Sequence, residues 1–310
     1  MSNKRKVIIW GYSSSKHTHY YTHEALRKAF DFCGYETHFF DNDNNPENFD
    51  YSNSIFFTEG FADHKIPLRK DCVYFVHVCV NPEKYLNAEV KKLIDVRYLM
   101  NYMDDDNYNF TLDRKSCEVL DEGVLLERNS AQPYEIIYMA WATNLLPQEI
   151  NLEWAKQKRE NTYYFAGSIS QSGRFANMPM ISEFVSECRK NEIGFTFVDP
   201  WTNPVSEEEH RVLIRKSYLS PDFRNKQHKE WGYIACRLMK SISFGQIGIT
   251  NCKTNANFLD ESIIYDENPS NLFYLGKEKM GDVKLIQHQM NLIKEKHTFV
   301  NRVKGIEKIL

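Results

Sequence analysis

Short, almost uniformly apolar runs that end in glycine or polar residues recur along the chain. The first, at 7–11 (VIIWG), is followed by a polar loop, by a helical pattern over 25–33, and by a second run at 36–41. Further runs at 54–60 and 72–80 continue the series. Uniformly apolar runs are typical of parallel strands covered on both faces, and strand–helix–strand units join such strands. The first half is therefore predicted to form an open parallel α/β sheet.

The second half repeats this order of elements. We expect strands at 163–170, 193–200, 217–222 and 246–251, and helices at 181–190, 207–215 and 233–244. Between the halves, residues 142–161 carry Pro147 and a charged stretch without strand character, which indicates a hinge. We predict two Rossmann-like domains, 1–150 and 151–310. The tail, 282–310, is one long helical pattern with a break near His297.

Charge and cysteine content narrow the class of protein. The net charge is −3, but residues 1–150 hold 16 Lys and Arg against 23 Asp and Glu, a net −7, while residues 151–310 hold 23 against 19, a net +4. This balance argues against nucleic-acid binding and suits a basic second half that holds a small anion. Seven scattered cysteines without a CxxC pair favour a reducing cytoplasm. No apolar run approaches the roughly 18 residues that span a bilayer, so membrane contact is expected to be peripheral at most.

The loop after the first apolar run contains several groups able to bind a polyol or accept a proton. It lacks the GxGxxG pattern of dinucleotide-binding folds. Its histidines, His17 and His19, are candidate bases near neutral pH. The candidate acceptor-binding residues are Ser14, Thr18 and Tyr21.

Two other interpretations of this loop stay open. It caps the following helix through Ser15 or Thr22, or, less favoured, it binds a metal, although no carboxylate or thiol lies at ligand spacing within it. Glu59 and Asp63, in TEGFAD after the third run, are candidate bases as well. His77 lies inside an apolar run and is interpreted as a core histidine.

The segment 217–251 is a candidate phosphate site. On a helix from Tyr233 onward, Tyr233, Arg237 and Lys240 fall on one side, while apolar residues occupy another. Cations in the first turns of a helix favour a phosphate ligand. The alternative is a solvated basic helix face.

Residues before this helix and in an earlier loop complete the candidate donor site. Gly167 and Ser168 lie where the strand expected at 163–170 runs into a small-residue loop, and Arg174 follows in that loop. Gly167 allows close backbone approach, and Arg174 is able to bind a phosphate with two hydrogen bonds. Pro221 and Asp222, at the end of the strand before the basic helix, are included.

Several segments together resemble glycosyltransferases of the GT-B fold. The segments AWATNLLPQEI (140–150), YYFAGSIS (163–170), GYIACRLMKSISFGQIGITN (232–251) and KHTFVNRVKGIEKIL (296–310) look like the hinge, second-domain start, donor helix and C-terminal helix of CgeB-like and related viral or bacterial transferases. The block 217–251 is also similar to the donor-binding block of fucosyltransferases that use GDP-fucose. On that pattern, Tyr233 matches a tyrosine and Arg237 a phosphate-binding lysine.

The resemblance departs from known patterns at two places. Gly232, Ala235 and Cys236 replace an aspartate, a threonine and a glutamate of the fucosyltransferase block, and the Ex7E motif of retaining GT-B enzymes is absent. An inverting enzyme is therefore favoured. The resemblance also implies that the two domains face each other across a cleft and that the C-terminal helix crosses back to the first domain.

The function that this resemblance implies is glycosyl transfer from a UDP- or GDP-linked sugar to a hydroxyl of a glycan, in the cytoplasm. No metal or other cofactor is expected, because cations and helix amides stabilise the leaving diphosphate. The base would be one of His17, His19, Glu59 and Asp63. A nucleotide-sugar epimerase and a non-catalytic nucleotide- or sugar-binding protein are the alternatives.

Overall fold

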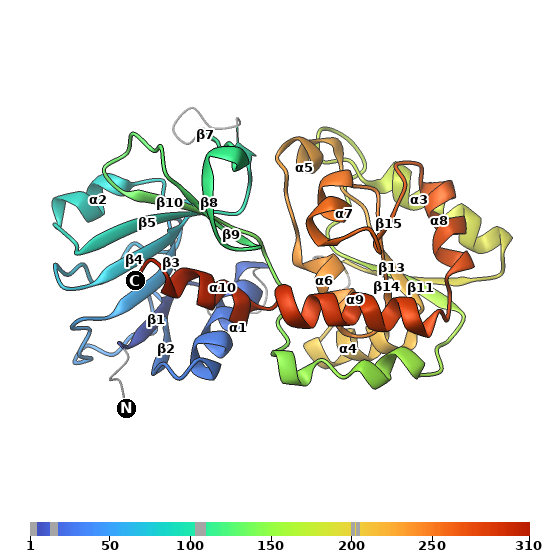
Figure 1. Ribbon diagram of the computed structural model, residues 1–310, viewed down its shortest axis with the longest axis horizontal. Helices are drawn as coiled ribbons and strands as arrows, with labels where there is room; N and C mark the ends of the chain where they lie inside the picture. Colours follow the sequence, from blue (N-terminus) through green and yellow to red (C-terminus); the bar gives the residue numbers. More distant parts are fainter. Residues whose placement is uncertain (1–4, 13–17, 103–109, 200–201, 203–204) are drawn as a thin grey trace. The chain divides into compact units, whose positions relative to one another are not determined.

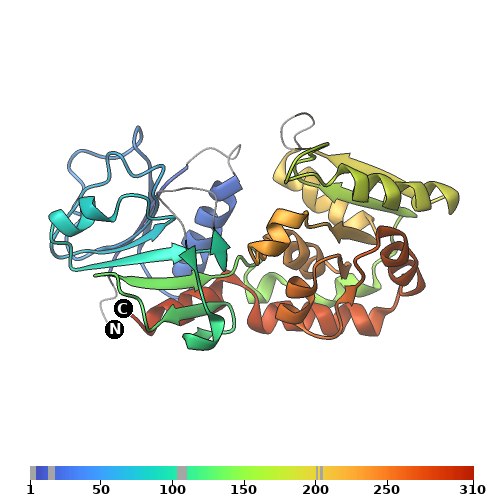
Figure 2. The same ribbon diagram turned by 90° about the horizontal axis from the view of Figure 1, so that it is seen from above.

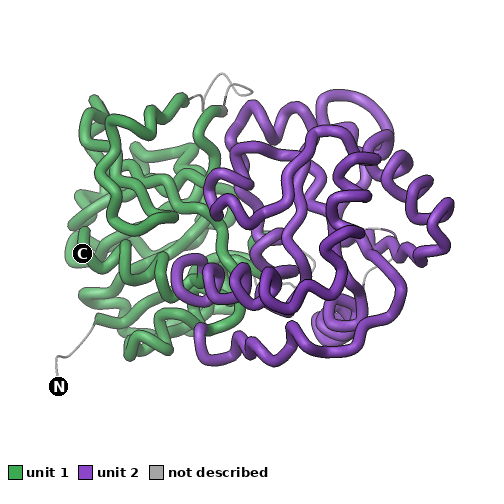
Figure 3. Tube along the Cα trace, turned by 45° about the vertical axis from the view of Figure 1, so that its right-hand side comes forward, with its two compact units in different colours: residues 1–146, 298–310 green, residues 147–297 purple. Residues whose placement is uncertain are grey.

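The chain divides into two compact units. The computed structural model describes residues 5–12, 18–102, 110–199, 202 and 205–310. Unit 1 consists of Met1–Leu146 and Thr298–Leu310, and unit 2 of Pro147–His297 (Figure 3). The last residues of the chain thus fold with the first unit and not with the second, in contrast to the expected second domain of 151–310.

Unit 1 is built on a mixed eight-stranded sheet with the order β2-β1-β3-β4-β5-β10-β9-β8 (Figure 1). Its described strands are β1 (Val7–Trp10), β2 (Thr37–Phe40), β3 (Ile55–Glu59), β4 (Val73–His77), β5 (Lys92–Arg97), β8 (Cys117–Asp121), β9 (Val124–Glu127) and β10 (Glu135–Met139), with a separate pair β6 (Asn101–Tyr102) and β7 (Phe110–Thr111). Its described helices are α1 (Thr18–Phe32), α2 (Pro82–Asn87), the short 3-10 helix Arg114–Ser116, and α10 (Phe299–Glu307).

Strands β2 to β5 and β10 are parallel to β1, as the apolar runs predict. β8 and β9 add an antiparallel hairpin, which the sequence analysis did not predict. The core of this sheet is aromatic: Phe57 and Phe75, on neighbouring strands, stack with ring centroids 4.5 Å apart. In β3 and β4, polar side chains follow the buried apolar residues at the carboxyl ends of the strands.

The C-terminal helix α10 packs against α1 in unit 1, as the fold prediction expected (Figures 1 and 2). Arg302 anchors it. The fully buried Arg302 guanidinium donates from Nε to the Ala140 carbonyl (2.9 Å) and pairs through Nη1 with Asp121 (3.0 Å). Such a buried pair costs several kcal/mol to break, about 3 to 5. The long helical pattern of the tail is interrupted at His297, where unit 2 ends.

Unit 2 is built on a parallel five-stranded sheet with the order β12-β11-β13-β14-β15. Its described strands are β11 (Thr162–Ala166), β12 (Gly194–Val198), β13 (Leu219–Asp222), β14 (Ile247–Thr250) and β15 (Ile264–Tyr265). Its described helices are α3 (Met178–Lys190), α4 (Glu207–Lys216), α5 (Lys226–Glu230), α6 (Cys236–Ser243), α7 (Lys253–Leu259), α8 (Pro269–Glu278) and α9 (Val283–Lys296), with 3-10 turns at Pro147–Glu149 and Leu152–Lys156.

Helices cover both faces of this sheet. Successive strand residues point to opposite faces. Tyr163 of β11 accordingly packs against Phe184 of α3 and Phe273 of α8, whereas Tyr164 contacts His210 of α4 and hydrogen-bonds to Ser241 of α6. The unit is therefore a doubly wound α/β layer. No helix in the described part of the chain is long and apolar enough to cross a membrane.

One helix boundary differs from the prediction. The helix expected over 233–244 begins at Cys236, because the preceding residues end α5 instead. Gly232 adopts a positive φ of 63°, and the Tyr233 N–H donates to the His228 carbonyl at 3.0 Å. Ala235 is extended and forms no side-chain cap, so α6 starts with uncapped backbone amides.

Candidate functional site

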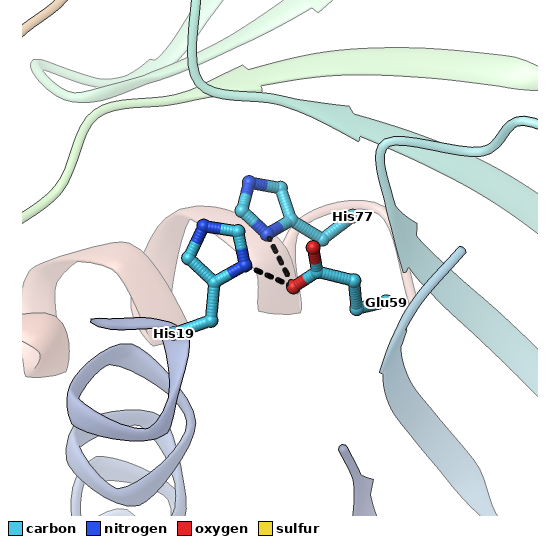
Figure 4. Close-up of side chains that lie close together, drawn as sticks. All are labelled: His19, Glu59 and His77. Carbon is cyan, nitrogen blue, oxygen red and sulfur yellow. Dashed lines mark hydrogen bonds and ion pairs between the residues drawn. The ribbon is translucent and has the colours of Figure 1, made fainter. Parts of the chain in front are cut away.

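Unit 1 brings two histidines and a glutamate together at the carboxyl edge of its sheet. Glu59 ends β3 and His77 ends β4, and the parallel register pairs these two residues directly. His19 lies in the first turn of α1 and hydrogen-bonds through Nδ1 to Glu59 Oε2. His77 Nδ1 lies 3.6 Å from the same oxygen (Figure 4). One carboxylate thus faces two imidazoles.

The cluster is buried and electrostatically coupled. The Glu59 side chain is 3% exposed, His77 9% and His19 17%. Burial disfavours the Glu59 anion, but hydrogen bonds from His19 and His77 outweigh it and hold the pKa of Glu59 well below its usual value. Burial lowers the pKa of His77 despite the neighbouring carboxylate. At neutral pH Glu59 is therefore charged and His77 neutral.

Aromatic rings and a constrained loop hold the cluster in place. The His19 ring lies 5.5 Å from the Trp141 ring, and the His77 ring lies 4.6 Å from that of Tyr98. Directly after His77, Val78 has a φ of +55°, which is strained for a β-branched residue. A Cβ on Gly60 would overlap the Val78 carbonyl oxygen, so only glycine allows this close backbone packing.

Two of the other sequence candidates in unit 1, Tyr21 and Asp63, have partners of their own. Ser14 and His17 lie outside the described residues, and Thr18 begins α1. The Tyr21 hydroxyl accepts a hydrogen bond from the Asn144 backbone N–H (3.1 Å), which ties α1 to the segment after β10. Asp63 pairs with Lys84 at 2.9 Å and accepts a hydrogen bond from the Tyr85 hydroxyl. Asp63 is therefore held by two residues of α2.

His77 is the member of the cluster that the sequence analysis missed. It is buried, as expected for a core histidine, but it faces Glu59. The sequence contains a signal for this contact. Both residues lie at the ends of neighbouring apolar runs, and parallel strands bring such positions side by side.

Unit 2 gathers positive charge at the carboxyl edge of its own sheet. Asp222, fully buried at the end of β13, accepts hydrogen bonds from Arg224 Nε (2.8 Å), Thr250 Oγ1 (3.0 Å) and Asn255 Nδ2 (2.8 Å). Burial opposes the charge on Asp222, but the Arg224 guanidinium holds the pKa of Asp222 below its usual value. Asp222 therefore fixes Arg224, and its carboxylate is not itself a phosphate ligand.

Arg237 is a second guanidinium at this edge and has no carboxylate of its own. It is the second residue of α6, and its guanidinium carbon lies 4.2 Å from the centre of the Phe165 ring. Within the described residues Arg237 makes no hydrogen bond or ion pair. Burial and the nearby Arg224 lower the pKa of Arg237 to about 10, so it remains charged at neutral pH. A partly buried cation in this setting favours an anionic ligand.

The backbone is shaped around this guanidinium. Gly167, directly after β11, has a φ of +147°, and a Cβ there would overlap Arg237 Nη2. β13 pairs with β11 only at Leu219 opposite Tyr163, and Pro221, which lacks an N–H, lies just beyond. The two strands part at the point where Arg237 approaches.

Aromatic rings surround the positive charges. The His228 ring lies 5.1 Å from the Tyr233 ring and 5.9 Å from the Phe175 ring. Burial, Arg224 and Arg237 together lower the pKa of His228 to about 4.

The loops after β11 and β13 are joined to each other. Asn225 Nδ2 donates to the Phe175 carbonyl at 3.1 Å, and Asn177 Nδ2 donates to the Ser168 carbonyl at 2.9 Å. The Arg174 guanidinium lies over the Phe175 ring, 4.9 Å from its centre. Ser168 and Arg174 are therefore part of the loop that borders the Arg237 site.

Two predicted members of the basic helix face differ from Arg237 in their position or partners. Tyr233 precedes α6 and contacts Arg224 from outside the helix, with the guanidinium 5.6 Å from its ring centre. Lys240 pairs with Glu207 of α4 at 3.1 Å, and its side chain is 8% exposed. Its charge is already offset by this ion pair with Glu207.

Comparison with known proteins identifies the fold. No family model and no curated protein sequence matches the chain. Among solved structures, it is similar to an alpha-glucosyltransferase in complex with UDP and a 13-mer DNA, with a TM-score of 0.54 and 10% identity over 94% of this chain and 95% of the other. It is also similar to an alpha,alpha-trehalose-phosphate synthase (UDP-forming) from Burkholderia vietnamiensis, with a TM-score of 0.55 and 8% identity over 99% of each chain. The two-unit α/β fold is the GT-B fold of these glycosyltransferases.

Proposed function

We propose that the chain is a glycosyltransferase that moves a sugar from a nucleotide diphosphate sugar to a hydroxyl of an acceptor glycan. The observation that carries the proposal is the Arg237 guanidinium, without a carboxylate partner among the described residues and enclosed by Gly167 and Phe165, at the carboxyl edge of the unit 2 sheet. Ligands of open α/β sheets bind at this edge. The similarity in fold to UDP-bound glucosyltransferases supports UDP as the nucleotide, with GDP as the alternative.

Unit 2 holds the donor in this proposal. As the bond between the sugar and the diphosphate breaks, the electron pair moves to the phosphate oxygen. Arg237 and the uncapped amides of α6 stabilise that charge, and Arg224 adds to the field. Because these fixed groups supply positive charge, the donor site is proposed to need no metal. The aromatic rings around His228 offer a surface for the nucleoside.

Unit 1 activates the acceptor. His19 Nδ1 is held by Glu59, which leaves Nε2 as the atom that takes the proton from the acceptor hydroxyl. The hydroxyl oxygen then forms a bond to the anomeric carbon as the diphosphate leaves from the opposite face, with inversion of configuration. The negative charge of Glu59 stabilises the imidazolium that forms, as a carboxylate does in other histidine dyads.

Three further points belong to this proposal. The net −7 of residues 1–150 favours a glycan over a nucleic acid as acceptor, although one similar structure contains DNA. All seven cysteines are free, in accord with a cytoplasmic protein. The likeness of residues 140–310 to CgeB-like transferases and GDP-fucose fucosyltransferases is kept as a proposal about the subfamily.

The experiment that tests the function is a donor screen read by NMR. The chain is incubated with UDP- and GDP-sugars and a panel of free glycans, and the anomeric configuration of each product is determined. A new glycoside of inverted configuration, formed by the wild type and lost in Arg237→Met, supports the proposal. Release of a changed nucleotide sugar without an acceptor would identify an epimerase instead. Absence of turnover with every donor would favour a binding protein.

A further inference from the structure

The cluster of His19, Glu59 and His77 contains one more histidine than proton transfer requires. A base and the carboxylate that orients it need one histidine, yet a second imidazole directs Nδ1 at the same carboxylate oxygen (Figure 4). One ligand atom from each of the three side chains lies within 4.8 Å of the others. Among the described residues, this is the one group of three or more such side chains with that spacing.

We propose that His19, Glu59 and His77 form a binding site for a borderline-soft divalent metal of the Zn²⁺ class, and that occupancy of this site inhibits the enzyme. Two imidazoles and one carboxylate form a common three-ligand set for Zn²⁺, with a further position open. Atoms that each lie about 2.1 Å from a tetrahedral metal are about 3.4 Å apart. The 3.6 Å between His77 Nδ1 and Glu59 Oε2 is close to that spacing.

The surroundings favour a metal of this kind over Mg²⁺ or Ca²⁺. Those hard cations prefer several oxygen ligands, whereas this site offers two nitrogens and one carboxylate. The site is largely shielded from water, since the Glu59 side chain is 3% and the His77 side chain 9% exposed. The rings of Trp141 and Tyr98 pack against the imidazoles, and such packing orients metal ligands.

Inhibition follows from the atom that the metal occupies. Zn²⁺ at His19 Nδ1 displaces the proton that bridges to Glu59, and this single proton of the neutral imidazole moves to Nε2. Nε2 is the atom proposed to accept the proton of the acceptor hydroxyl, and it then carries a proton already. His19 bound in this way no longer acts as a base. This inhibitory consequence rests on the proposed function, whereas the binding itself does not.

The test is a calorimetric titration of metal-free protein with ZnCl₂. We expect one site per chain in the wild type, weakened about tenfold or more in His77→Gln. His38→Gln is the matched control, because His38 Nε2 pairs with Glu36 at 2.8 Å on the same unit but has no third ligand group at ligand spacing in the described chain. It should bind as the wild type does. MgCl₂ should give no comparable site.

A folding check and a second variant distinguish the possible outcomes. Because His77 is buried, thermal unfolding without metal checks that His77→Gln folds, and His19→Gln is a second variant at the more exposed side of the cluster. Equal Zn²⁺ affinity in both variants and the wild type would overturn the site. Metal binding that depends on His77 without loss of transferase activity would leave the site in place and contradict the proposed base role of His19.

Discussion

Units 1 and 2 are both α/β layers, but they differ in their electrostatics. Each has a group of ionisable side chains at the carboxyl ends of its parallel strands. In unit 1 that group is one carboxylate between two histidines, and in unit 2 it is two guanidiniums with one carboxylate. The topology determines where ionisable side chains gather, and the polar residues at the ends of the strands determine the charge of that group. Unit 1 is suited to moving a proton, and unit 2 to binding an anion.

The largest expected effect comes from removing the base in unit 1. His19→Ala should lower kcat by about 10² to 10⁴-fold, because proton removal from the acceptor loses its catalyst. The affinity for UDP, measured by calorimetry, should stay within a few-fold, since the nucleotide is held by unit 2. Asp63→Asn is the control, because Asp63 is engaged by Lys84 and Tyr85. If Asp63→Asn lost as much activity as His19→Ala, the division of roles in unit 1 would be wrong.

A smaller effect is expected from the glycine that faces Arg237. Gly167→Ala should raise the Kd for UDP about tenfold, because the added methyl displaces the guanidinium. Gly173→Ala is the matched control. Its φ of +77° is also positive, but nothing lies within 4 Å of the added Cβ. Equal UDP affinity in the two variants would separate Gly167 from the anion site.

The smallest effect is on the pH dependence of stability. The pKa of His228 falls from its ordinary 6.5 to about 4 in the folded chain. Between these values the unfolded chain binds a proton that the folded chain does not, so the free energy of unfolding rises with pH in this window. The contribution is complete above about pH 6.5 and is lost as the pH falls towards 4.

Thermal unfolding between pH 4 and 6.5 checks this expectation. His228→Gln should flatten the rise of Tm with pH, whereas His64→Gln, at an exposed position of unit 1, should leave the slope unchanged. His210, whose pKa burial and Lys240 lower to about 3, is retained in both variants and continues to contribute in the same direction. An unchanged slope in His228→Gln would contradict the positive field inferred at the unit 2 site.

The fold was predictable where local pattern and topology agree. Uniform apolar runs predicted β1, β3, β4 and β11 because strands covered on both faces leave that pattern. The hairpin of β8 and β9 was not predicted, because its burial is mixed and its pairing depends on distant residues. The start of α6 was misplaced because Tyr233 donates its N–H to end α5, a tertiary detail that helical periodicity does not report.

The site was predictable in part for the same reason. Arg237 and His19 were selected as candidates from a helical pattern and from the loop after an expected strand. The pairing of Lys240 was not foreseen, because periodicity gives the face of a residue on its helix but not its partner, which here is Glu207 from another helix. His77 was misjudged because its neighbour Glu59 is close only through the register of two strands.

The most direct test of the account is UDP binding to two variants of one helix. Arg237→Met and Lys240→Met each remove one positive charge from α6, but Lys240 is already paired with Glu207. With millimolar UDP and EDTA, the Tm of the wild type and of Lys240→Met should rise, because a ligand that binds only the folded chain stabilises it. Arg237→Met should show little or no rise. A rise of equal size in Arg237→Met, or none in the wild type with either UDP or GDP, would contradict the assignment of unit 2 as the donor site.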